Sequence, residues 1–328
     1  MKILGKSPLQ QYKERNQRLR DFFSKYSLLN KVIPFMGLGV VVIFFAIVTN
    51  GSILSVRNLQ LIGLQSVILI IGTIGASFTI SHGNFDLSLG GVLGMSAVSG
   101  AMAGAINPLL TLPVCIFVGL VIGIIISVIH TRLKIPTFII TIAMMFIGRG
   151  ITAIISASQK LSFPASLDWM NNPILYFLTF IVVYIVAYIL FEFTKVGKYN
   201  KAIGSNFVAA TISGIPISKF KIIAFCISGI TVGICAFLSM ARTGTVAAST
   251  GSGFEINVLI SLVLGGASLT GGTNVKLRGA IIGCLILTML ENGLLMWGLD
   301  VNLVGTVKGI IFIASVAFAY DRRSGQIV

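Results

Sequence analysis

The chain has 328 residues, of which 55% are hydrophobic and only 10% charged, and its mean hydropathy is +0.99. These values exclude a soluble globular protein with one apolar core and indicate a protein that crosses a membrane many times. The net charge of +15 does not predict a nucleic-acid partner, because the sequence contains no solvated basic domain that could bind one.

The N-terminal segment is strongly basic. Its first 31 residues carry eight of the 24 lysines and arginines. They contain no compact apolar core followed by a cleavage site, so they do not resemble a secretory signal. We expect residues 1–30 to form a basic cytoplasmic segment that contacts anionic membrane lipid, and residues 31–328 to form the transmembrane domain.

Apolar runs of about 20 residues, the length that spans a bilayer, recur along the rest of the chain. Ten candidate spans lie near residues 31–50, 58–80, 86–106, 110–130, 136–158, 173–194, 220–242, 255–271, 278–297 and 302–320. The fold class is therefore an all-α polytopic membrane protein of about ten transmembrane helices. Glycines interrupt the apolar runs near residues 80–90 and 250–275, so the pattern is compatible with nine to eleven helices.

A polar interruption separates the second and third runs, in the segment Ser81-His82-Gly83-Asn84-Phe85-Asp86-Leu87-Ser88. Backbone that leaves a helix at membrane depth must be buried in protein or line a cavity, and an acidic group there indicates function. We expect Asp86 to hold the base of a broken helix. His82, four residues before Asp86, is interpreted as a satisfied polar cap, with a proton relay as the alternative.

Other residues inside the apolar runs are candidates for packing or for a substrate path. The four cysteines lack the spacing of a disulfide framework or a metal site, so no metal ligands are predicted. Glu291 and Lys308 lie at similar depths on runs joined by a tight turn, which favours a structural ion pair. The candidates for a substrate path are Asn84, Phe85, Asp86, Ser88, Arg149, Glu255, Asn257 and Asn292.

The segment 195–219 is the only sizeable loop on its side of the membrane and has basic residues at both ends. Asn206 can cap a helix of about two turns that begins at Phe207, Gly214 can close it, and Pro216 prevents its continuation. Phe207, Ala210 and Gly214 are expected to share one face, which suits docking to a partner protein. The alternative is an interfacial helix that lies on lipid.

The dipeptide Phe85-Asp86 has a counterpart 169 residues later in Phe254-Glu255, again just before a glycine-rich apolar stretch. This offset corresponds to five spans, so the second copy would run with the opposite polarity. We expect spans 2–5 and 7–10 to form an inverted repeat, an arrangement that places substrate pathways at the interface of the two halves.

The distribution of charge predicts the orientation. With ten spans and an inside N-terminus, 19 of the 24 lysines and arginines fall in cytoplasmic segments. Short cytoplasmic loops hold an excess of these residues, so both termini are expected in the cytoplasm. The chain has no phosphate-binding loop of the Gly-x-x-x-x-Gly-Lys-Ser/Thr type, so it cannot hold nucleotide phosphates itself, and energy must come from a partner or from an ion gradient.

Five ordered segments, which cover roughly residues 58–323, resemble the permease subunits of bacterial ABC importers in the ribose, galactose, arabinose and autoinducer-2 group. They are the loop 197–215, the Gly83 to Ser88 segment, Pro136 to Gly150, Leu264 to Gly272, and Lys308-Gly309 with Asp321. Two departures from the group's pattern bear on partner or substrate choice. Val208 stands where an acidic residue is usual, and Ser81-His82 precede the first glycine in place of small residues.

The resemblance implies a multi-pass protein of the bacterial cell membrane that carries a monosaccharide or a similar small polar solute and is not itself an enzyme. It implies three partners: a second permease copy, identical or closely related, two cytoplasmic ATPase domains, and an extracytoplasmic solute-binding protein. ATP and Mg²⁺ would be used by the ATPase, and no cofactor is expected on this chain. The residues that match the coupling segment are Asn206, Phe207, Val208, Ala209, Ala210, Ser213 and Gly214.

Three other functions remain open at this point. Nucleosides or branched-chain amino acids are alternative substrates for the same kind of permease. A proton-coupled secondary transporter would explain an inverted repeat with His82 and Asp86. A membrane scaffold without transport activity is the third possibility.

Overall fold

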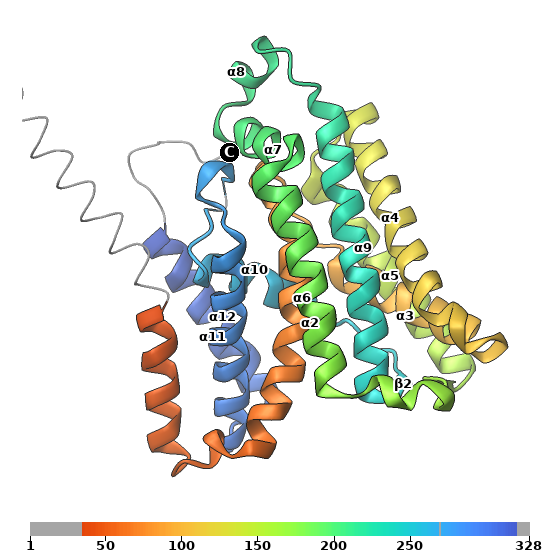
Figure 1. Cartoon of the computed structure of the whole chain (residues 1–328), viewed down its shortest axis with the longest axis vertical. Coiled ribbons are helices and arrows are strands. Elements are labelled where there is room, and N and C mark those ends of the chain that lie inside the picture. The colour runs from red at the N-terminus through yellow and green to blue at the C-terminus, as the bar shows by residue number, and fades with distance from the viewer. Residues whose placement is uncertain (1–34, 269, 320–328) are drawn as a thin grey trace, which may run out of the picture.

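The structure is a computed structural model that describes residues 35–268 and 270–319. The predicted basic segment 1–30 and the C-terminal Arg322 and Arg323 lie outside the described residues. Within them the chain is mostly helical, and Figure 1 shows a bundle whose long helices run side by side.

Ten apolar helices occupy the positions of the ten predicted runs. Seven are long and apolar enough to cross a membrane: α2 (Val56–Ser81), α3 (Leu89–Ile106), α4 (Thr111–Leu133), α5 (Thr137–Ser158), α6 (Pro173–Tyr188, continued by a π-helical turn over Ile189–Phe193), α9 (Ile217–Thr243) and α11 (Leu277–Met296). The other three are the first helix (Phe35–Val48), α10 (Phe254–Leu264) and α12 (Val301–Ala319), whose side chains are described over Val301–Ala317. The polytopic all-α architecture is confirmed.

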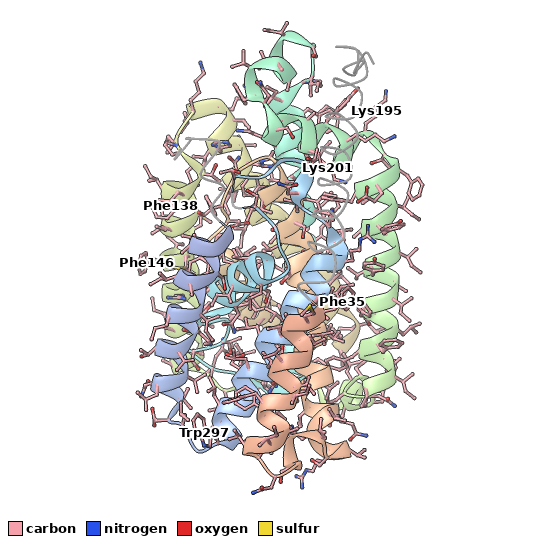
Figure 2. The ribbon with its side chains drawn as sticks, turned by 90° about the vertical axis from the view of Figure 1, so that its left-hand side faces the viewer. Phe35, Phe138, Phe146, Lys195, Lys201 and Trp297 are labelled. Atoms are coloured by element: carbon pink, nitrogen blue, oxygen red, sulfur yellow. The ribbon has the colours of Figure 1, made fainter. Side chains whose placement is uncertain are left out.

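The two ends of the bundle differ. At one end lie the short helices α7 (Lys195–Ser205) and α8 (Phe207–Ile212), and at the other a two-stranded antiparallel sheet joins β1 (Leu161–Ser162) to β2 (Thr245–Val246). Figure 2 shows Lys195 and Lys201 at the first end and Trp297 at the opposite end. Below, the two ends are called the α8 end and the β-sheet end.

The centre of the bundle is built from α2, α3 and α9, whose side chains are mostly buried. The outer helices α5 and α6 expose apolar side chains, among them Phe138 and Phe146, which point away from the body in Figure 2. Exposed apolar residues on outer helices are expected where lipid or another membrane protein surrounds the bundle.

Helices α4 and α9 approach closely through glycine. A Cβ atom placed on Gly119 would lie 2.2 Å from the carbonyl oxygen of Gly229, and one placed on Gly123 would lie 2.4 Å from that of Phe225. Small residues let helix backbones touch where lipid provides no hydrophobic driving force for association.

One expectation about the elements is wrong, and one helix was not predicted. The eighth run was expected to continue to residue 271, but α10 ends at Leu264, because the backbone turns at Gly265 and Gly266 and follows an irregular path. This path lies against the end of α2 and the end of α7. A Cβ atom on Gly271 would lie 2.6 Å from the nitrogen of Gly83, just after α2. A Cβ atom on Gly272 would lie 3.0 Å from the Oγ atom of Ser205, the last residue of α7. The segment 195–219 also holds a second helix, α7, which was not expected.

Candidate functional site

The polar interruption between α2 and α3 is a true helix break, formed by residues 82–88. The Asp86 carboxylate is buried and accepts hydrogen bonds from the Ser88 backbone N–H at 3.0 Å and the Ser88 hydroxyl at 2.5 Å. Ser228 of α9 donates to its other oxygen at 3.3 Å. Asp86 therefore satisfies the backbone at the start of α3 and links this start to α9.

His82 and Asn84 of the same break differ from expectation. His82 is 5% exposed and neither ring nitrogen has a hydrogen-bond partner among the described residues, so its interpretation as a satisfied cap is wrong. Asn84 contacts the other histidine, His130 of α4, at 3.1 Å. Phe85 is half-buried against the main core.

Arg149 and Glu255, 106 residues apart in the sequence, form an ion pair between α5 and the first turn of α10. The Glu255 side chain is 3% exposed and that of Arg149 34%. The pair lies beside α3, because a Cβ atom on Gly90 would lie only 2.0 Å from Glu255 Oε2. Arg149 thus neutralises a buried carboxylate at the centre of the bundle.

Glu291 of α11 and Lys308 of α12 also lie together, with 2.5 Å between Lys308 Nζ and Glu291 Oε1. Asn257 of α10 bridges them: its carbonyl oxygen accepts from Lys308 at 3.1 Å and its amide donates to Glu291 at 3.4 Å. These contacts join three helices through one polar cluster.

A cavity of about 330 Å³ lies towards the β-sheet end, between α2, α3, α9, α10 and α11. Its polar lining comes from Gln65, Ser239, Arg242, Ser252, Asn257, Thr288, Glu291 and Asn292. Of the eight predicted path residues, Asn257 and Asn292 line it. The others do not, namely Asn84, Phe85, Asp86, Ser88, Arg149 and Glu255.

Two buried polar atoms of the residues that line the cavity have no protein partner in the part of the chain that the structure describes. Asn292 Oδ1 and Arg242 Nε are buried and make no hydrogen bond in the described structure. An unsatisfied buried acceptor and donor are costly, so both groups would gain from a rearrangement that brings them a hydrogen-bond partner. Sequence reasoning missed Gln65 and Arg242, because nothing in their local patterns places them beside α11.

The predicted short helix in the segment 195–219 is confirmed as α8. The Asn206 side chain accepts a hydrogen bond from the Ala209 N–H at 2.9 Å, Gly214 has a φ of 75°, and α9 begins after Pro216. The expected common face is wrong, however. Ala210 is buried against Ile203 and Phe220, and the exposed apolar side chains of α8 are Phe207, Val208 and Ile212.

The chemistry of these clusters is that of binding and conformational change. Amides, hydroxyls and paired charges converge in the middle of the helix bundle, and among the described residues no group of three or more His, Cys, Asp or Glu side chains is placed to hold a metal ion. Amides offer donors and acceptors without net charge, which suits a hydroxyl-rich solute.

The sequence matches a family described as "Branched-chain amino acid transport system / permease component" over residues 58–316. Among similar proteins are the ribose import permease protein RbsC of Escherichia coli K12, 28% identical over 90% of this chain and 95% of its own length, and RbsC of Bacillus subtilis, 29% identical over 90% and 94%. The autoinducer 2 import system permease protein LsrC of Photorhabdus luminescens is 30% identical over 83% of this chain and 87% of its own length. No solved structure matches the chain.

Proposed function

The chain belongs to this family of transport-system permease components, as a membrane-embedded permease subunit of an ABC importer, and from that premise we propose that it carries a monosaccharide or a similar small polyhydroxylated solute across the bacterial membrane. The observation that supports this substrate class is the 330 Å³ cavity with its amide and hydroxyl lining. Its volume is at the lower end of the range for small-molecule sites.

The solute would contact the Asn292 amide and the Arg242 guanidinium, because both residues line the cavity. An amide can donate a hydrogen bond to a solute hydroxyl or accept one from it, and a guanidinium can donate one. The polar cluster of Asn257, Glu291 and Lys308 forms part of the same wall or lies directly behind it. The relatives named for ribose and autoinducer 2 support this class of cargo.

A second permease copy is part of the proposal, and the position of Arg149 supports it. Arg149 lies midway along α5, its side chain is 34% exposed, and its neighbours Phe146 and Ile147 are exposed and apolar. A guanidinium that faces hydrocarbon at this depth is costly, so we propose that another protein copy or an aqueous path covers this face.

The two ends of the bundle suit the two remaining partners. The exposed Phe207, Val208 and Ile212 of α8 suit a groove on an ATPase, which would use ATP and Mg²⁺ and move α8. A solute-binding protein would deliver cargo at the β-sheet end, towards which the cavity lies. In this orientation the α8 end faces the cytoplasm.

The finer topology also belongs to the proposal. We propose that the ten helices all cross the membrane, that both termini are cytoplasmic, and that spans 2–5 and 7–10 form an inverted repeat. Basic residues of separate segments support the orientation: Arg132 and Lys219 line one surface cavity at the α8 end, where α7 also carries Lys195 and Lys201.

The test is uptake by proteoliposomes that contain this chain with its ATPase and binding protein. We expect ATP-dependent uptake of a pentose or related sugar, and a loss of about tenfold or more in Asn292→Leu, because a buried hydrogen bond to a polar solute is lost. Ser158→Leu, at an exposed position outside the cavity, is the control.

Different outcomes would contradict different parts of the proposal. ATP-dependent uptake of nucleosides or branched-chain amino acids in place of sugars would overturn the substrate class. Uptake by this chain alone, driven only by a proton gradient, would overturn the ATP-driven mechanism.

A further inference from the structure

A second polar network lies at the α8 end, apart from the cavity. Its centre is His130, near the end of α4. The His130 Nε2 atom lies 2.9 Å from Lys221 Nζ of α9 and 3.1 Å from Asn84 Nδ2 of the helix break, and Nδ1 lies 2.8 Å from the Ile135 carbonyl oxygen. Three separate segments therefore meet at one imidazole.

The lysine contact assigns the proton of the imidazole. A lysine ammonium can only donate, so Nε2 is the acceptor of the 2.9 Å contact, and Nδ1 is placed to donate its hydrogen to the Ile135 carbonyl. The imidazole is consequently neutral. Lys221 takes part in none of the three ion pairs formed by the described residues.

Lys221 also contacts α8. Its ammonium lies 5.8 Å from the centroid of the Phe207 ring, within the range of a cation–π interaction. Phe207 is the first residue of α8 and Asn206 is its cap. Lys221 thus contacts the short helix on one side and His130 on the other.

The helix break at residues 82–88 connects this network to α3, which lines the cavity. Asn84 is two residues from Asp86, which holds the start of α3. The backbone of α3 touches the segment before α10, since a Cβ atom on Gly90 would lie 2.4 Å from the Gly251 oxygen, and Leu93 of α3 and Gly251 both line the cavity. A continuous series of contacts therefore connects α8 to the cavity wall.

We propose that Lys221 and His130 are positioning residues that transmit the movement of α8, through Asn84 and the 82–88 break, to α3 and the cavity. This inference rests on the proposed function, because it assumes that α8 is the element moved by the ATPase. The energetic coupling is expected to run through one network, so its members act as a unit.

The test measures ATP hydrolysis and solute uptake by the reconstituted complex for Lys221→Met, His130→Leu and the double variant. We expect each single variant to lower the number of solute molecules moved per ATP by about tenfold, within the range typical of coupling between sites, while the ATPase still co-purifies. The double variant should be no worse than either single one. His130→Gln should retain coupling, because its amide oxygen can replace Nε2 as acceptor.

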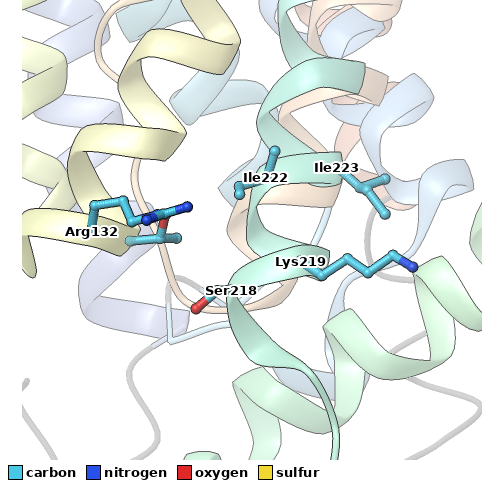
Figure 3. Close-up of a pocket in the computed structure, with 6 residues that line it drawn as sticks. Arg132, Ser218, Lys219, Ile222 and Ile223 are labelled. Atoms are coloured by element: carbon cyan, nitrogen blue, oxygen red, sulfur yellow. The ribbon is translucent and has the colours of Figure 1, made fainter.

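The matched control is Lys219→Met. Lys219 lies on the same helix two residues earlier, is exposed, and lines a surface cavity of about 370 Å³ with Arg132, Ser218 and Ile222. Figure 3 shows its side chain extending away from Arg132. Removing this charge should leave uptake per ATP unchanged.

The inference would be overturned if Lys221→Met moved as many solute molecules per ATP as the wild type, or if the losses of the two single variants added up in the double variant. The proposed function would still stand in that case, provided that the wild-type complex shows ATP-driven uptake. A wild-type complex without ATP-driven uptake would instead overturn the proposed function. If Lys221→Met fails to assemble, Asn84→Ala is tested in its place. The wild-type number of solute molecules per ATP in this variant would overturn the inference. A lower number in a complex that still assembles would support it.

Discussion

At the scale of single residues, two ion pairs inside the bundle join side chains from different helices. Glu255 is buried and its partner Arg149 comes from another helix, while Glu291 and Lys308 come from neighbouring helices and share Asn257. Charge and spacing along the sequence identified Glu291 and Lys308 as a pair, because a short turn joins their helices. The same two signals could not predict the Arg149–Glu255 pair, because that contact depends on how α5 packs beside α10.

The Arg149–Glu255 pair yields a prediction about stability. Arg149→Met should destabilise the protein by about 3 kcal/mol, because it leaves the Glu255 carboxylate buried without a counter-charge. The double variant Arg149→Met/Glu255→Gln should recover most of this loss, since neither charge remains. Thermal unfolding in detergent, followed by size-exclusion chromatography, measures both. Equal stability of the Arg149→Met single variant and the wild type would show that the pair does not compensate a buried charge.

At the scale of elements, local signals predicted α8 well and its neighbours less well. The Asn206 cap, Gly214 and Pro216 define the start and end of α8 from the sequence alone, because capping and backbone restrictions act over a few residues. The burial of Ala210 was not predictable from the same signals. It follows from the contact with Phe220 of α9 and Ile203 of α7, and α7 itself was not expected.

The contact between α4 and α9 gives a second prediction. Gly119→Val should prevent these helices from reaching their present separation, because even a Cβ atom would lie 2.2 Å from the Gly229 oxygen. We expect a loss of about 1–3 kcal/mol or failure to assemble, as in other overpacked cores. Gly63→Val on α2, where nothing lies within 4 Å of the added atom, is the control. Fluorescence-detected size-exclusion profiles compare the two, and identical profiles would contradict the close packing of α4 on α9.

At the scale of the whole molecule, the orientation in the membrane can be tested directly. The positive-inside rule and the basic α8 end predict that α8 is cytoplasmic and that the 3-10 helix Ala165–Met170 is outside. In intact cells a membrane-impermeant thiol reagent should therefore label Asp168→Cys and leave Thr211→Cys unlabelled until the membrane is permeabilised. Three of the four native cysteines are buried, and the wild type serves as the background control. The reverse labelling pattern would invert the proposed orientation.

The sequence by itself determined the class of protein, the positions of the ten apolar helices and the local structure of α8. These features depend on hydrophobicity over about 20 residues and on backbone restrictions at Asn206, Gly214 and Pro216, which act locally. The tertiary structure alone decided which side chains line the cavity, how far α10 extends, and that Asn84, His130 and Lys221 meet. The physical reason is that these contacts depend on close helix packing through glycine, which joins residues far apart in the chain and leaves no periodic pattern in the sequence.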